Sequence, residues 1–231
     1  MTVLSAIRKA VLRTVGTVPS GIFVSTDRVA QEFADLSNEV ARDIVGSHDW
    51  RALTSIATLV ADGVQTAYPL PDDYDRMVMA SIVQDAQSWF WGYDTIGSVD
   101  EWIYYQNGGW QPIHGAWIIL ENQFQFSPAP TGNAVFPYIT KNYAIDANGV
   151  IKREFTADDD TFRLDERLLT LGLISRWREQ KGLDATLDGA NYELALSQAQ
   201  ARDAGARIIR TASRYTGPLN TYLAWPGILG P

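Results

Sequence analysis

The stretch 165–180, DERLLTLGLISRWREQ, predicts the helix around which the rest of the fold is built. Asp165 stands where a side chain can cap the first turn of a helix running from about 166 to 180. Its apolar residues occupy most of the helix circumference, which is typical of a helix covered by other elements on several sides. They are Leu168, Leu169, Leu171, Leu173, Ile174 and Trp177.

Three further helices are predicted outside the β-rich segment, two before the central one and one after it. Val29, Phe33, Leu36, Val40 and Ile44 recur at steps of three and four residues, which predicts an amphipathic helix from about 26 to 47. A shorter amphipathic stretch, 3–15, precedes it. A long helix is predicted from about 187 to 212, and one of its faces carries mostly small side chains that allow a neighbouring helix to approach closely. The residues of this seam are Ala190, Leu194, Ser197, Ala201, Ala204 and Ile208.

The segment between these helices has the pattern of short strands and turns. The dipeptides Asp62–Gly63 and Asn148–Gly149 each separate two β-prone runs, and both favour hairpin turns because they tolerate positive φ. Between them, Ser98 and Glu101 have the spacing of a capping box and predict a helix that stops at the Asn-Gly-Gly of 107–109. The run 115–130, GAWIILENQFQFSPAP, predicts one strand that its prolines end.

These patterns predict an α+β fold. Residues 1–50 and 163–212 form a helical bundle, 51–162 form an inserted antiparallel β-rich module, and 213–231 form an extended C-terminal arm. The chain has 231 residues, of which 46% are hydrophobic, and this is ample for a buried core.

Composition excludes several classes of function. The formal net charge of −8 gives no basic footprint for binding along a nucleic-acid backbone. The absence of cysteine excludes disulfides, thiolate catalysis and cysteine-based zinc or iron–sulfur sites, and two histidines argue against a histidine metal cluster. Paired carboxylates could still bind a hard cation or serve glycosidase chemistry, but we expect no metal or cofactor. Charged residues interrupt the apolar N-terminus, and no apolar stretch is long enough to span a bilayer, so we expect synthesis in the cytosol and no membrane partner.

Candidate catalytic groups are sparse. Two acidic stretches, PDDYDR (71–76) and TADDDTFRLDE (156–166), lie beside predicted element boundaries, where Asp is common as a cap or turn residue. His114 could serve as a general base, but no serine or cysteine elbow accompanies it, and a turn histidine fits equally.

An aromatic run, 88–117, admits three interpretations. Its rings could form the core of a shallow sheet, a protein interface, or a platform on which sugars stack. The five rings that we consider for an interface are Trp89, Trp91, Trp102, Tyr105 and Trp110.

The C-terminal stretch 213–231, SRYTGPLNTYLAWPGILGP, is too apolar to be left in water and too rich in proline and glycine for a helix. We therefore expect it to be extended and to dock, either on its own subunit or on a partner. Its anchor candidates are Tyr215, Leu219, Tyr222, Leu223, Trp225 and Ile228.

The order of these features resembles one family over nearly the whole chain. The chain is similar to head-to-tail adaptor proteins of tailed bacteriophages, of the tail tubular protein A type. The similarity lies in the order of a helix pair, YPLPDDYDRM (68–77), a tryptophan-rich middle, FQFSPAP (124–130), and DDDTFRLDERLLTLGLISRWREQKGLD (158–184) before an alanine-rich helix. The most telling pieces are 69–72 with Tyr74 and Arg76, and 168–182 with Trp177.

The resemblance implies a function and a set of partners. Such adaptors stack as a ring, usually of twelve copies, between the portal and the tail or nozzle protein, in the virion at the head–tail junction. It implies that the helix seam packs subunit against subunit, that the aromatic module faces the tail, and that the C-terminal arm binds the portal. An acidic channel would let double-stranded DNA pass without specific binding.

The resemblance therefore implies a structural, non-enzymatic protein whose ring helps to close the DNA-filled head. Two alternatives stay open. One is a carbohydrate-binding tail or baseplate component that uses the aromatic run. The other is a cell-wall hydrolase, for which Glu101, Glu121 and Glu154 are the available carboxylates.

Overall fold

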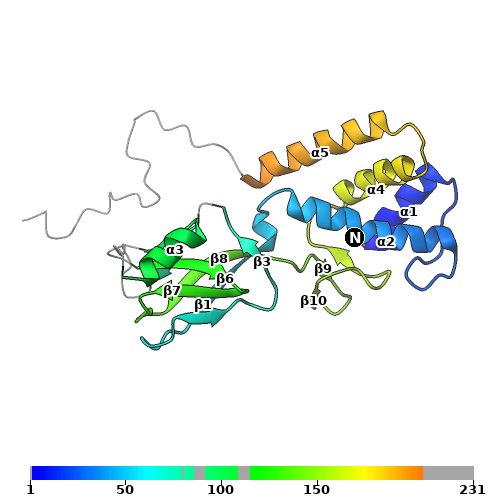
Figure 1. Ribbon diagram of the computed structural model, residues 1–231. Helices are drawn as coiled ribbons and strands as arrows, with labels where there is room; N and C mark the ends of the chain where they lie inside the picture. Colours follow the sequence, from blue (N-terminus) through cyan, green and yellow to red (C-terminus); the bar gives the residue numbers. More distant parts are fainter. Residues whose placement is uncertain (1, 80, 86–91, 109–114, 205–231) are drawn as a thin grey trace, which may run out of the picture.

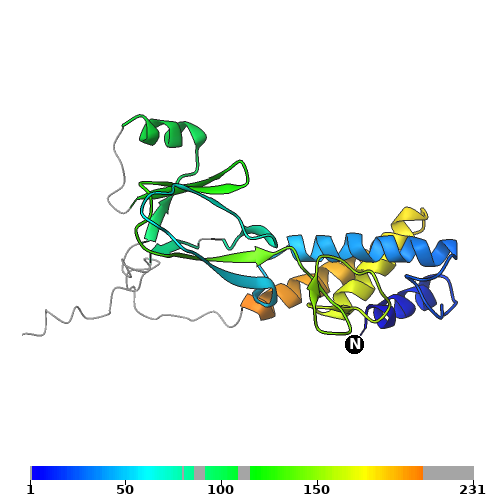
Figure 2. The same cartoon turned by 90° about the horizontal axis from the view of Figure 1, so that it is seen from below.

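The computed structural model describes residues 2–79, 81–85, 92–108 and 115–204. It is an α+β fold, as predicted, in which α1, α2, α4 and α5 lie at one end and a curled β-sheet lies at the other (Figures 1 and 2). The helices are α1 (Val3–Thr14), α2 (Arg28–Gly46), α3 (Val99–Gln106), α4 (Glu166–Gln180) and α5 (Thr186–Ala204), with a short 3₁₀ helix, η1 (Arg51–Leu53).

The strands form two sheets. The larger sheet has the order β1-β8-β4-β5-β6-β7-β2, and β3 also pairs with β8. Its members are β1 (Thr54–Leu59), β2 (Ala67–Pro69), β3 (Tyr74–Met77), β4 (Val83–Asp85), β5 (Gly92–Thr95), β6 (Ala116–Leu120), β7 (Gln123–Ser127) and β8 (Ala134–Thr140). The smaller sheet, β10-β9-β11, comprises β9 (Ala144–Ile145), β10 (Ile151–Lys152) and β11 (Thr161–Phe162).

The helix predictions are confirmed for α1, α2 and α4, because burial follows their apolar periodicity. Helix α4 lies between α1, α2 and α5, and its buried residues share one core with theirs. Asp165 caps it as expected, accepting a hydrogen bond from the backbone N–H of Arg167 at 2.8 Å. Phe33 of α2 stacks on Trp177 of α4 with ring centroids 5.9 Å apart.

Two local predictions in the sheet are wrong, and the one for α3 is confirmed in part. The runs around Asp62–Gly63 do not form a hairpin, because β1 pairs with β8 and β2 pairs with β7 at the other edge of the sheet, where Tyr68 packs against Phe126. The single strand expected at 115–130 is the hairpin of β6 and β7, turned at Glu121 and Asn122, which both have positive φ. The helix predicted between Ser98 and Asn107 is confirmed as α3, but Ser98 makes no side-chain capping bond. Glu101 instead accepts a hydrogen bond from the Tyr105 hydroxyl at 3.1 Å.

The second predicted hairpin is confirmed. Ile151 pairs with Ile145 across the turn, and Gly149 has a φ of 83°. The core residues of this small sheet, Tyr143, Ala144, Phe155 and Phe162, are buried together with the helices. The range 51–162 therefore contains both the large sheet and a small sheet that packs with the helical end.

Arg76 joins the sheet to the helical end of the molecule, and Asp73 forms hydrogen bonds within the sheet. Arg76 donates to Asp49 Oδ1 at 3.0 Å and to the carbonyls of His48 and Val45 at the end of α2. Asp73 accepts hydrogen bonds from the hydroxyls of Tyr138 at 2.7 Å and Thr140 at 2.8 Å. The acidic motif at 71–76 thus holds the sheet together and fixes it to α2.

The stability of this region should depend on acid pH through Asp73. Burial raises the pKa of Asp73, but the hydrogen bonds from Tyr138 and Thr140 outweigh it and leave the pKa below its ordinary value. A lowered folded-state pKa contributes stability that is present above the ordinary value, about pH 4, and is lost as pH falls through the folded pKa. Asp73→Asn should lower stability at neutral pH and flatten its fall below pH ~4, as urea unfolding at a series of pH values would measure. An unchanged pH profile would contradict this assignment.

Candidate interaction surface

Helix α5 presents one face to the subunit and the opposite face to solvent. Ala195 and Leu196 are buried against the helical core, and Tyr192 packs at its margin. The described side chains of the predicted seam are on the other side and exposed: Ala190, Leu194, Ser197 and Ala201. Leu194 is 59% exposed and the neighbouring Leu187 is 79% exposed. A solvent-facing stripe of this kind is available to a second molecule.

For two residues of the predicted seam, the exposure of the side chain is not described. Ala204 is the last described residue of α5, and its side chain lies outside the description. Ile208 lies outside the described residues, as does the rest of the segment 205–231.

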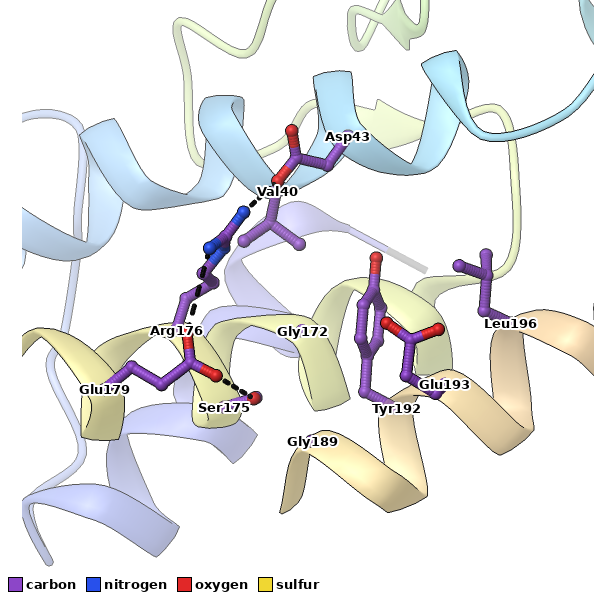
Figure 3. A pocket seen from close by; sticks show the side chains of 10 residues that line it. All are labelled: Val40, Asp43, Gly172, Ser175, Arg176, Glu179, Gly189, Tyr192, Glu193 and Leu196. Atoms are coloured by element: carbon purple, nitrogen blue, oxygen red, sulfur yellow. Dashed lines mark hydrogen bonds and ion pairs between the residues drawn. The ribbon is translucent and has the colours of Figure 1, made fainter. Parts of the chain in front are cut away.

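A pocket of about 300 Å³ lies where α2, α4 and α5 meet (Figure 3). The closeness of the helices depends on Gly172 of α4. A Cβ at this position would stand 2.5 Å from Cγ1 of Val40 and 3.2 Å from Cε2 of Tyr192. The glycine therefore lets α2 and the Tyr192 ring approach the α4 backbone and shapes the pocket.

Carboxylates dominate the rim of this pocket. Arg176 pairs with Asp43 at 2.7 Å and lies 3.7 Å from Glu179. Its pKa is raised, first by the hydrogen bond to Asp43. Burial, followed by the negative charges of Asp43 and Glu193, raises the pKa of Tyr192 to about 12. One arginine thus faces several acids, and the pocket carries a net negative charge.

The end of α5 is fixed beside the junction of helices and sheet. The Gln200 side-chain amide donates to the carbonyl of Ser47 at 3.3 Å. Asp203 accepts from the backbone N–H of Arg51 at 3.0 Å and lies 3.4 Å from Nε2 of His48. The last described turn of α5 therefore lies beside η1 and the C-terminal end of α2.

The arm residues are not described by the structure, so their portal-binding role stays a prediction. They are Tyr215, Leu219, Tyr222, Leu223, Trp225 and Ile228. In the aromatic module, Trp89, Trp91 and Trp110 also lie outside the described residues, as does His114.

The two described aromatic candidates, Trp102 and Tyr105, belong to the core. They are 5% and 8% exposed and pack with Ile96, Ala116 and Ile118 between α3 and the sheet. This burial matches the core interpretation of the aromatic run at these two positions, and neither ring is free to stack on a sugar.

The acidic candidates have structural partners. Asp158 accepts hydrogen bonds from the backbone N–H groups of Ile22 and Phe23, and the buried Asp160 pairs with Lys152 at 2.7 Å. Glu154 pairs with Arg42 at 3.2 Å, and Glu121 is in the turn between β6 and β7. Within the described ranges, His and acidic side chains form no group suited to hold a metal ion.

Sequence reasoning missed the pocket and the junction, although signals for both were present. Gly172 is a glycine inside an otherwise strongly apolar helix, which often marks close packing. Arg76 follows an acidic turn, and such an arginine can satisfy the carbonyls at a helix C-terminus.

Among the described residues, no helix combines the length and apolarity that a membrane span requires.

Comparison with known proteins gives one family match. No curated protein matches the chain. The SU10 adaptor protein family matches residues 1–222 of the 231. Because the match covers nearly the whole chain, the protein belongs to the SU10 adaptor protein family.

Proposed function

We propose that the protein is a structural head-to-tail adaptor of a tailed bacteriophage. Its copies form a ring that joins the portal to the tail and helps to close the DNA-filled head. The observation that carries the proposal is the family match over residues 1–222. The narrower likeness to the tail tubular protein A type, and a ring of twelve, remain predictions from sequence.

The exposed face of α5 supports assembly from many copies. Ala190, Ser197 and Ala201 are small, exposed and on the side of the helix away from α4. Small side chains let two helix backbones approach closely, so a helix of the next subunit can pack here. On this proposal the exposed Leu194 is buried when the ring forms.

The net negative charge of the chain is compatible with a ring whose channel lets DNA pass. A net charge of −8 disfavours retention of phosphate backbones, so double-stranded DNA can pass without being held. The apolar segment 213–231 supplies a second contact, on the portal, because its composition favours a buried state over a solvated one.

The test is the mass of the purified chain, measured by light scattering alone and with the portal protein of the same phage. A ring in either sample supports the proposal, whereas a monomer indifferent to the portal contradicts it. Ser197→Trp should abolish the ring because the indole blocks the approach of two helices. Asn191→Trp is the matched control, since Asn191 is exposed on the same helix but off the seam, and it should leave the mass unchanged.

A further inference from the structure

Helix α2 has a hollow on each of two sides. Val40 and Asp43 line the pocket shared with α4 and α5, whose other charged residues are Arg176, Glu179 and Glu193. Arg42, Val45 and Gly46 line a second pocket, of about 200 Å³, with Asp75, Lys141, Tyr143 and Arg153. Figure 1 shows α4 and α5 on one side of α2 and the hairpin of β9 and β10 on the other.

The first hollow is acidic. Its one arginine, Arg176, is held by Asp43 and Glu179, and Glu39 adds a further negative charge near it. Glu193 is exposed on the rim and makes no ion pair within the described part of the chain. Figure 3 shows its carboxylate beside the Tyr192 ring, at the α5 side of the pocket.

The second hollow is basic. Arg42 is paired with Glu154 at 3.2 Å, and both side chains are about half exposed or more. Lys141 and Arg153 add two positive charges to the lining, which holds one carboxylate, Asp75. Asp75 shares Arg76 with Asp49, and Lys141 also acts on the nearby Asp73 carboxylate. Arg153 is exposed and, among the described residues, has no ion-pair partner. The protein is acidic overall, so a hollow with surplus cations is a local exception.

Opposite charges on two sides of α2 favour head-to-tail self-association over a two-fold contact. In a two-fold contact each surface meets its own copy, and here that would bring like charges together, which is costly. In a head-to-tail contact one side meets the other side of the next copy, and such contacts can close into a ring. The charges therefore favour a second copy of this chain, in head-to-tail orientation, as the occupant of both hollows.

We propose that the basic hollow around Arg153 and Lys141 of one copy docks against the acidic hollow around Glu193 and Asp43 of the next. The inference rests on the proposed ring and specifies which surfaces form it. The acidic hollow adjoins the exposed face of α5, so both surfaces contribute to one continuous contact.

A charge swap tests the contact. Glu193→Lys and Arg153→Glu each place like charges across it and should weaken self-association at least ~10-fold. The double variant, with both changes in one chain, should recover it. An equal mixture of the two single variants should also assemble, because each variant then finds its complement in the other. Sedimentation velocity over a concentration series, with the portal present if wild type assembles only there, measures each case.

Three controls make the result decisive. Both positions are exposed, so urea unfolding of each variant should match wild type. Asp100→Lys makes the same change of charge at an exposed position of α3, away from both hollows, and should not alter assembly. Wild-type association should weaken as salt rises, since screening acts on exposed charges.

The outcomes separate this inference from the proposed function. Wild-type rings with unaffected single variants, or single variants that neither the double variant nor the mixture rescues, overturn the contact but leave the ring. If Glu193→Lys weakens self-association but Arg153→Glu does not, the proposed contact is also overturned. That result would assign the acidic hollow to another occupant, such as segment 205–231, which has three arginines and no acidic residue. Wild type that never assembles, even with the portal, contradicts the proposed function itself.

Discussion

Gly172→Val is expected to lower the free energy of unfolding by about 2–3 kcal/mol, even though valine is a better helix former than glycine. The added Cβ would stand 2.5 Å from Cγ1 of Val40, which is 1% exposed and is branched at Cβ, so it cannot turn aside. The Tyr192 ring, 3.2 Å away, blocks the other direction. Either α2 and α5 move away from α4, or the core side chains leave their preferred rotamers.

Urea unfolding followed by circular dichroism measures this change, and Gly189→Ala is the matched control. Gly189 is also inside a helix, but a Cβ there would meet only Oγ of Ser175 at 3.5 Å, an ordinary contact. Gly189→Ala should therefore raise stability by about 0.5–1 kcal/mol. Combining Gly172→Ala with Val40→Ala should relieve the clash that Gly172→Ala makes alone. If Gly172→Val unfolds at the same urea concentration as wild type, the close packing of α2 on α4 is wrong.

The helices could be predicted because their signal is local. In α2, buried apolar residues recur at steps of three and four positions, and the face they form is also the face that packs: Ala30, Phe33, Leu36, Val40 and Ile44, with Ala41 and Val45 beside them. In α4, an apolar circumference predicted a central position, and α1, α2 and α5 do surround it. Periodicity sets the buried face of a helix without any knowledge of its partner.

The strand order of the large sheet could not be predicted, because pairings such as β1 with β8 and β2 with β7 are between residues far apart in sequence. The turn at Gly63 has the positive φ that its Asp-Gly sequence favours, but the strands on either side of it pair elsewhere. The real hairpin turn at Glu121 and Asn122 was missed because glutamate is an uncommon choice at positive φ. Which strand a short β-run joins is decided by side-chain packing across the sheet, such as Tyr68 on Phe126, and a local pattern does not contain it.

One part of the candidate surface could be predicted from the sequence and another part could not. The small-residue stripe on α5 could be predicted from spacing, and its described members are exposed. The two charged hollows could not, because each gathers residues from separate elements: Asp43, Arg176 and Glu193 on one side of α2, and Arg42 and Arg153 on the other. Opposed charge of this kind emerges only when the helices and the small sheet are placed around α2.

Arg76→Met is expected to cost about 2–3 kcal/mol, since hydrogen bonds to charged groups contribute about 1.5–3 kcal/mol when one partner is lost. Arg76 satisfies the carbonyls of Val45 at 3.2 Å and His48 at 2.9 Å, where α2 ends and its last carbonyls have no partner within the helix. A positive charge at this end also interacts favourably with the helix dipole. The methionine retains the length of the side chain but removes all of these bonds and leaves Asp49 Oδ1 without its guanidinium partner.

The loss of stability in Arg76→Met should be concentrated at the junction of helices and sheet, and hydrogen exchange can locate it. Amides of residues 45–50 and 74–79 should exchange faster in Arg76→Met, because the contact that fixes β3 to α2 is gone. Arg28→Met is the control: its pair with Glu32 is within one exposed turn of α2, where Arg28 is 87% exposed, and such pairs contribute about 0.3–0.5 kcal/mol. Arg76→Lys should fall between the two, since an ammonium restores the charge but not the forked geometry that reaches Asp49 and two carbonyls at once. Equal stability and equal exchange in Arg76→Met and Arg28→Met would show that the contacts of Arg76 do not hold the sheet to the helical end of the molecule.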